Sequence, residues 1–109
     1  MSEPLEFPGV GHTYEAHLGS DVFRLHFESD SLMHAKGIAG VNRGFDEREN
    51  VIIRGIRPGL FMLFWQESSG STVTLVQDFD LETAYSTITI PDDDGTVFLR
   101  FEGDFKQID

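Results

Sequence analysis

Residues 60–79 read LFMLFWQESSGSTVTLVQDF and begin with an unbroken apolar run. Two segments rich in Leu, Phe, Val and Thr flank the turn signal at residues 68–70. Such a pattern predicts a β-hairpin whose strands cover residues 60–67 and 71–78. The first of these strands is apolar on both faces, so each face needs something to cover it.

Turn signals recur at short intervals along the rest of the chain, and the segments between them are rich in Phe, Val, Ile, Thr and Leu. Alternation supports several of these segments, since Phe23, Leu25 and Phe27 share one face of a strand. Short strands at regular spacing indicate an all-β protein. The expected strands cover residues 12–18, 21–28, 32–39, 50–57, 60–67, 71–78, 83–90 and 96–105.

Eight consecutive antiparallel strands with short links close most simply into a small up-and-down barrel, because closure removes exposed sheet edges. A two-sheet sandwich is the alternative. The length suits one core, so residues 1–109 are expected to form a single domain. The polar link at residues 40–50 (GVNRGFDEREN) is either a mobile flap at the barrel mouth or an ordinary surface loop.

Composition and charge narrow the classes of partner. The chain has 19 acidic and 8 basic side chains and a formal net charge of −11, so nucleic acid and anionic membrane surfaces would be repelled. It has no apolar window long enough to cross a bilayer, no secretion signal at its N-terminus, and no Cys. We therefore expect a cytoplasmic protein that binds neither nucleic acid nor membrane.

Glu67 is the first candidate for a functional residue. It shares strand parity with Phe61, Leu63 and Trp65, so its carboxylate points into the barrel near one open end if the strand continues that far. The alternative is that the strand has ended and Glu67 lies on a solvated hairpin. A carboxylate in an apolar mouth is costly unless it is paired or used. An inward Glu67 would therefore indicate a binding or catalytic role.

The segment from Glu49 to Asp78 resembles the central hairpin of two related calycin-type families, the MoaF-like proteins and the phenolic acid decarboxylases. The shared pattern is an apolar strand ending Trp-x-Glu, a Gly three residues later, and a Val/Thr-rich strand. Here these are Trp65, Glu67, Gly70 and residues 72–75. Residues 11–14, 36–40 and 84–91 also resemble strands of these families, so the resemblance covers most of the chain. It implies a lipocalin-like barrel that needs no cofactor.

The resemblance also implies roles for individual residues. In the decarboxylases the matching Glu is catalytic and works with an Arg and two Tyr, so Glu67 matches the acid and Tyr14 matches one Tyr. The second Tyr is Ala16 here, and the expected Arg falls on Val41, with Arg43 two positions further on. These departures argue against phenolic acid decarboxylation and leave the MoaF-like resemblance intact.

Three functional hypotheses follow. The first is a barrel that holds a small apolar or aromatic ligand against Phe61, Leu63 and Trp65. Its polar groups would be Glu67 and Tyr14, with Arg43, Arg54 and Tyr85 as further candidates. The second is a cofactor-free lyase or isomerase in which Glu67 moves a proton. The third is a filled barrel used for assembly. A cavity beside Glu67 would argue against the third, and a second titratable group hydrogen-bonded to Glu67 would favour the second over the first.

No metal site is expected. The His residues at positions 12, 17, 26 and 34 match no ligand spacing, and the acidic run at residues 92–95 is typical of a hairpin turn rather than a calcium loop.

The outward side chains of the first strand, Leu60, Met62 and Phe64, predict a cover from outside the barrel. A homodimer is the simpler cover. An N-terminal segment carrying Leu5 and Phe7 across this face is the alternative.

Overall fold

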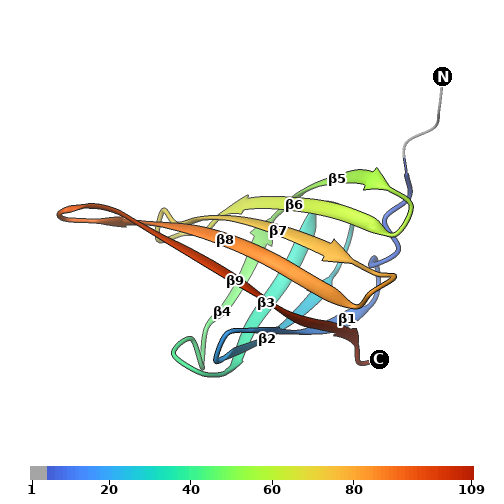
Figure 1. Ribbon diagram of the computed structural model, residues 1–109, viewed down its shortest axis with the longest axis horizontal. Coiled ribbons are helices and arrows are strands. Elements are labelled where there is room, and N and C mark those ends of the chain that lie inside the picture. The colour runs from blue at the N-terminus through green and yellow to red at the C-terminus, as the bar shows by residue number, and fades with distance from the viewer. Residues whose placement is uncertain (1–4) are drawn as a thin grey trace.

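The computed structural model describes residues 5–109, and all its regular elements are β-strands. The strands are β1 (Thr13–Leu18), β2 (Asp21–Phe27), β3 (Leu32–Ala39), β4 (Asp46–Asn50), β5 (Ile52–Arg57), β6 (Leu60–Gln66), β7 (Thr72–Asp78), β8 (Thr83–Asp92) and β9 (Gly95–Gln107). Paired neighbours are antiparallel, in the order β4-β3-β2-β1-β9-β8-β7-β6-β5 (Figure 1). The part of the chain that the structure describes contains no helix that could cross a membrane.

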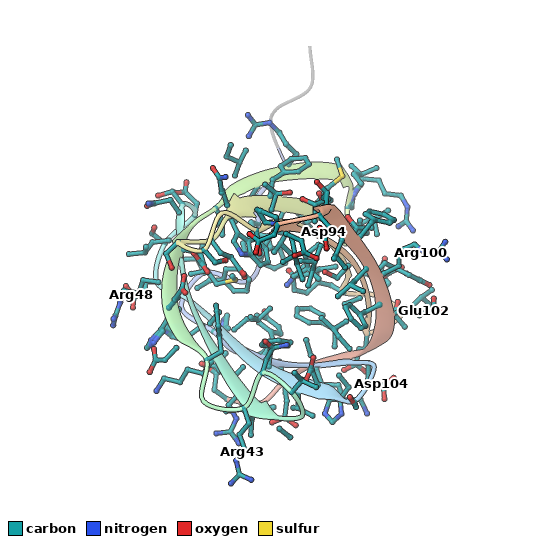
Figure 2. All side chains as sticks on the ribbon, turned by 90° about the vertical axis from the view of Figure 1, so that its left-hand side faces the viewer. Arg43, Arg48, Asp94, Arg100, Glu102 and Asp104 are labelled. Carbon is teal, nitrogen blue, oxygen red and sulfur yellow. The ribbon has the colours of Figure 1, made fainter. Side chains whose placement is uncertain are left out.

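The sheet curls into a nearly closed barrel, which appears as a ring when viewed end-on (Figure 2). Strands β4 and β5 lie at the two ends of the sheet order, so the ring has a seam between them. Part of this seam is bridged by Glu47 of β4, whose carboxylate accepts hydrogen bonds from the backbone N (3.4 Å) and Oγ (3.0 Å) of Ser68 in the β6–β7 turn.

The predicted all-β barrel is confirmed, but the number of strands was wrong by one. Residues 50–57 were expected to form one strand after a long loop, whereas β4 occupies the second half of that loop and β5 begins at Ile52. Register explains why β4 escaped prediction. Glu47 and Glu49 pair with Ala35 and Met33 and share their inward side. Inward carboxylates contradict the hydrophobic alternation by which strands are recognised.

Aromatic side chains fill one end of the barrel interior. This aromatic plug consists of Phe7, Tyr14, Phe27, Phe61, Phe79 and Phe105. Phe7 packs edge-on against Phe27 and Phe61, with ring centroids 4.9 and 5.3 Å away. Fully burying such a ring stabilises a fold by about 1.5–3 kcal/mol. Because Phe7 lies inside the barrel end, its ring does not cover the outer face of β6.

Candidate functional site

The opposite end of the barrel, which we call the mouth, contains a cavity of about 50 Å³. Its wall is mainly apolar and consists of Leu18, Phe23, Leu25, Ala35, Phe45, Trp65, Glu67, Val73, Leu75, Ser86 and Ile88. A space of this size holds a few water molecules or one small chemical group. The interior beside Glu67 is therefore not completely filled.

Glu67 lies directly after β6, and the β6–β7 turn fixes its position. Its backbone N donates to the Ser71 carbonyl (2.8 Å), and its own carbonyl accepts from the backbone N of Gly70 (2.9 Å). Gly70 has a φ of 95°, a conformation that strongly favours glycine and that this tight turn requires. The side chain of Glu67 is half-buried on the cavity wall and accepts a hydrogen bond from Trp65 Nε1 (3.4 Å). The side chain of Glu67 therefore points into the barrel, which is the direction that strand parity indicated.

Two further carboxylates lie close to Glu67. That of Glu47 affects the pKa of Glu67, and the pKa of Glu49 is in turn affected by Glu67. Burial raises the pKa of Glu67, the hydrogen bond from Trp65 opposes this, and the charge of Glu47 adds to it. Burial also raises the pKa of Glu49 to about 7, with contributions from Glu47 and Glu67. Glu49 is only 3% exposed, and its Oε2 has no hydrogen-bond partner among the described residues. A carboxyl group with such a pKa exchanges protons near neutral pH.

The described lining of the cavity carries no basic side chain. Burial and neighbouring carboxylates thus keep the pKa values of Glu67 and Glu49 raised, instead of depressed as an adjacent Arg would make them. Such a set can accept hydrogen bonds from a ligand, attract a cation, or exchange a proton near neutral pH.

The inward candidates on β6 occupy successive levels of the interior. Trp65 and Glu67 line the cavity, Leu63 is fully buried in the core, and Phe61 belongs to the aromatic plug. Tyr14 also belongs to the plug, where it stacks on Phe105 with ring centroids 4.6 Å apart, and burial raises its pKa. The structure thus brings Trp65 and Glu67 together and places Tyr14 at the other end of the barrel.

The remaining three candidates point away from the interior. Arg43 is exposed in the turn before β4 and extends outward from the ring (Figure 2). Arg54 is exposed on β5 and donates to the carbonyl of Ile53 (3.0 Å). Tyr85 is 48% exposed on β8, on the side opposite the buried Ala84 and Ser86.

Sequence reasoning missed Glu47, Glu49 and Gln77. The first two stand two residues apart in DEREN, which places both on one face once that segment is known to be a strand. Gln77 is fully buried on the inner face of β7, and neither its Oε1 nor its Nε2 has a partner in the described part of the chain. Its position among buried apolar residues of β7 gave the only signal.

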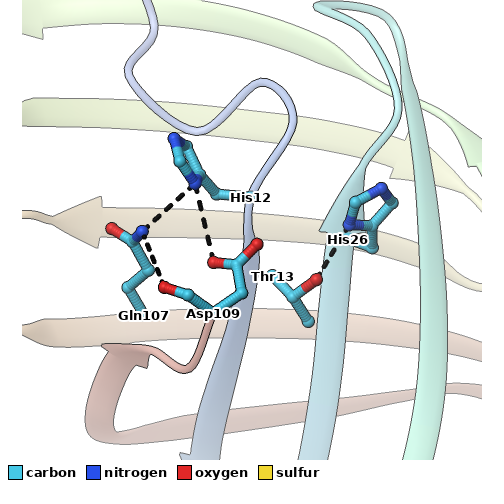
Figure 3. A network of polar contacts seen from close by, with 5 residues as sticks. All are labelled: His12, Thr13, His26, Gln107 and Asp109. Atoms are coloured by element: carbon cyan, nitrogen blue, oxygen red, sulfur yellow. Dashed lines mark hydrogen bonds and ion pairs between the residues drawn. The ribbon is translucent and has the colours of Figure 1, made fainter.

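The His residues are engaged separately in polar contacts. His12 Nδ1 lies 3.5 Å from a carboxylate oxygen of Asp109 and 3.1 Å from Gln107 Nε2, and His26 Nδ1 lies 2.8 Å from Thr13 Oγ1 (Figure 3). Within residues 5–109, no group of three or more His, Cys, Asp or Glu side chains is arranged to hold a metal ion.

The fold and its acidic mouth define a small lipocalin-like β-barrel. A family model described as MoaF-like matches residues 10–106. The chain therefore belongs to the MoaF-like family, as the Trp-x-Glu hairpin predicted.

The chain is also similar to a solved protein from Burkholderia vietnamiensis that is provisionally described as a β-lactamase. The two share 18% sequence identity with a TM-score of 0.85, and the match covers 95% of this chain and 99% of that one. At this level of identity the likeness shows the fold alone. A search of curated proteins found no match.

Proposed function

We propose that this barrel binds a small apolar or aromatic molecule at its mouth. One observation carries the proposal: Glu67 is half-buried on the wall of an apolar cavity, where Trp65 Nε1 holds its carboxylate and no described lining residue is basic. Apolar pockets with a few convergent polar groups are the usual form of a ligand site. In this arrangement Trp65 contacts an apolar or aromatic part of the ligand, and Glu67 accepts from its polar group.

The size of the cavity limits what enters it. Pockets for drug-sized ligands are typically about 300 Å³ or more, whereas this cavity measures about 50 Å³. The inner wall continues beyond the mouth, because the β8–β9 hairpin projects past the barrel (Figure 1). Ile88 lines the cavity, and Ile90, Val97 and Leu99 extend the same side of the hairpin outward. The small polar end of the ligand enters the cavity, and its apolar remainder lies along this extension.

The charge at the mouth favours a ligand with a hydrogen-bond donor or a positive charge. The charge of Glu47 already raises the pKa of Glu67, and the charges of Glu47 and Glu67 raise the pKa of Glu49, so a ligand carboxylate would add to that repulsion. A ligand ammonium group would relieve it and could also stack on the indole of Trp65. Within the class of apolar and aromatic molecules, we therefore favour amines and neutral donors over acids.

A cofactor-free lyase or isomerase that uses Glu67 as proton donor or acceptor is the second candidate. The raised pKa of Glu67, and that of Glu49 near 7, suit proton transfer at neutral pH. The side-chain hydrogen bond seen for Glu67 goes to Trp65 and not to a second titratable group. This favours binding over catalysis. The cytoplasmic location expected from the composition stays a prediction under either function.

Native mass spectrometry of the protein purified from its own host tests the proposal. We expect a small-molecule adduct on the wild type that Glu67→Gln loses. Asp30→Asn, which makes the same change from acid to amide on the exposed β2–β3 turn, should keep it. An adduct held equally by Glu67→Gln would place the ligand elsewhere. Conversion of the released molecule by fresh protein would favour the enzyme.

A further inference from the structure

The outer surface of β6, β7 and β8 is unusual for so acidic a chain. We call it the threonine face, and it consists of Leu60, Met62, Phe64, Thr72, Thr74, Val76, Tyr85, Thr87 and Thr89. It contains no charged side chain, although the chain has 19 acidic residues and a net charge of −11. The carboxylate next along β7, Asp78, is buried and accepts hydrogen bonds from the backbone N of Asp80 and Leu81 (3.0 and 2.9 Å).

The threonine face is not covered by the described part of the chain. Phe7 packs inside the aromatic plug, and Leu5 lies against Gly55 and not over β6. Beside the apolar row of β6, the face is hollowed into a groove of about 530 Å³ over β7, β8 and β9. Val76 and Tyr85 lie in this groove, and Arg100 and Glu102 of β9 border it.

We propose that a second copy of this chain docks on the threonine face about a twofold axis. The row Leu60, Met62 and Phe64 of each copy then lies in the β7–β9 groove of the other. A twofold contact uses the same patch on both copies, so an apolar row next to a groove is self-complementary. Sheets pack face to face in this way about 10 Å apart.

Charge supports a second copy as the occupant. Two chains of net charge −11 repel each other over most of their surfaces, so they associate most easily where carboxylates are few. The threonine face has none, and at the border of the groove Glu102 is accompanied by the oppositely charged Arg100. A basic partner would be drawn to the acidic surfaces elsewhere and not to this one.

The available area agrees with a dimer of modest affinity. Four strands, β6 to β9, at about 4.8 Å spacing and about 23 Å length give roughly 450 Å² per copy. Both copies together then bury about 900 Å², which is below the size of a stable interface and fits a weak one. We therefore expect a dissociation constant in the micromolar range, with association strengthened by added salt because the like net charges are screened.

Sedimentation equilibrium of the full chain between about 1 and 100 µM tests the proposal. We expect the wild type to approach twice the monomer mass of 12.3 kDa at the upper concentrations. Tyr85→Arg and Thr74→Arg each place a long cation in the contact and should raise the dissociation constant at least tenfold. His17→Arg, on the outer side of β1 where its side chain is 51% exposed, is the matched control and should change it less than twofold.

Circular dichroism spectra matching the wild type show that each variant is folded, and Thr87→Arg replaces any variant that fails this check. A wild type that stays monomeric at 100 µM would contradict the proposal. A dimer that survives the substitutions on the threonine face, or that His17→Arg dissociates, would equally contradict it.

Discussion

The two ends of this barrel are built from one sheet, but their inward side chains differ. One end is filled by aromatic rings, and the other contains carboxylates. At the plug end, aromatic rings pack against one another in edge-on and stacked contacts. At the mouth, Glu67 lines an incompletely filled cavity, and Glu47 and Glu49 of β4 also face the barrel interior. Burial that stabilises a ring penalises a carboxylate. The plug therefore stabilises the fold. The buried carboxylates near the mouth destabilise it, which is the pattern expected of a functional site.

The largest loss of stability is expected when a residue of the aromatic plug is truncated. Phe27 is fully buried against Phe7 and Tyr14, so Phe27→Ala should lower the free energy of unfolding by about 3–5 kcal/mol. Phe45→Ala makes the same truncation at the half-buried cavity wall and should cost less than half as much. Urea unfolding of both variants measures the difference. Equal losses at the two ends would show that the mouth is packed as tightly as the plug.

The next effect concerns Glu49 and the pH dependence of stability. Its pKa of about 7 in the folded protein lies above the ordinary value of 4.5, so folding favours the protonated form. The stability from this group is complete below pH 4.5 and is lost as pH rises through 7. As pH rises from 5 to 8, we expect the free energy of unfolding of Glu49→Gln to increase relative to that of the wild type by about 2 kcal/mol.

Unfolding midpoints measured across this range check the prediction for Glu49. Asp30→Asn, which makes the same change from acid to amide at an exposed position in the β2–β3 turn, provides the control. A wild type whose stability rose from pH 5 to pH 8 relative to Glu49→Gln would reverse the sign and show a charge-stabilised carboxylate.

Glu67 should show the same trend at smaller amplitude, because the hydrogen bond from Trp65 offsets part of the effect of burial. Glu67→Gln should leave the barrel folded and flatten the pH dependence less than Glu49→Gln does. The decisive readout for this variant is loss of the ligand adduct. Unchanged pH dependence together with an intact adduct would remove Glu67 from the site.

The smallest effect is expected on the outside of β1–β4, where exposed charges pair with one another. The side chains of Arg48 and Glu28 form an ion pair with N and O atoms 2.9 Å apart. Because both are solvated, Arg48→Ala should change stability by less than about 1 kcal/mol. Thermal unfolding at low and high salt measures this, and a loss above that limit would give this surface a structural role that the exposure of the pair does not support.

The sequence predicted the barrel, and of the two positions it left open for Glu67, strand parity indicated the inward one that the structure has, because both features depend on local alternation. The hairpin at residues 60–79 has a strong period-two pattern and a turn that requires Gly70. The MoaF-like resemblance rested on the same residues. Such features are readable from neighbouring residues alone.

The rest of the mouth could not be predicted, because it depends on contacts between distant segments. Strand β4 escaped notice because its inward residues are acids, and their proximity to Glu67 arises only when the barrel closes. Family matching placed Tyr14 beside Glu67, but the register of β1 with β9 pairs it with Gln107, and its ring stacks on Phe105. Arg43, Arg54 and Tyr85 carry suitable chemistry, and only the three-dimensional structure shows that they face outward.

The central claim is that the mouth binds a small donor or cation through Glu67 and Trp65, and tryptophan fluorescence tests it most directly. Trp65 is the only Trp in the chain, so any change in emission reports on the mouth. Phenethylamine and phenylacetate serve as probes that share an aromatic ring and differ in charge. We predict saturable quenching by the amine, little response to the acid, and at least tenfold weaker binding of the amine to Glu67→Gln. Equal responses to both probes, or amine binding unchanged in Glu67→Gln, would contradict the account.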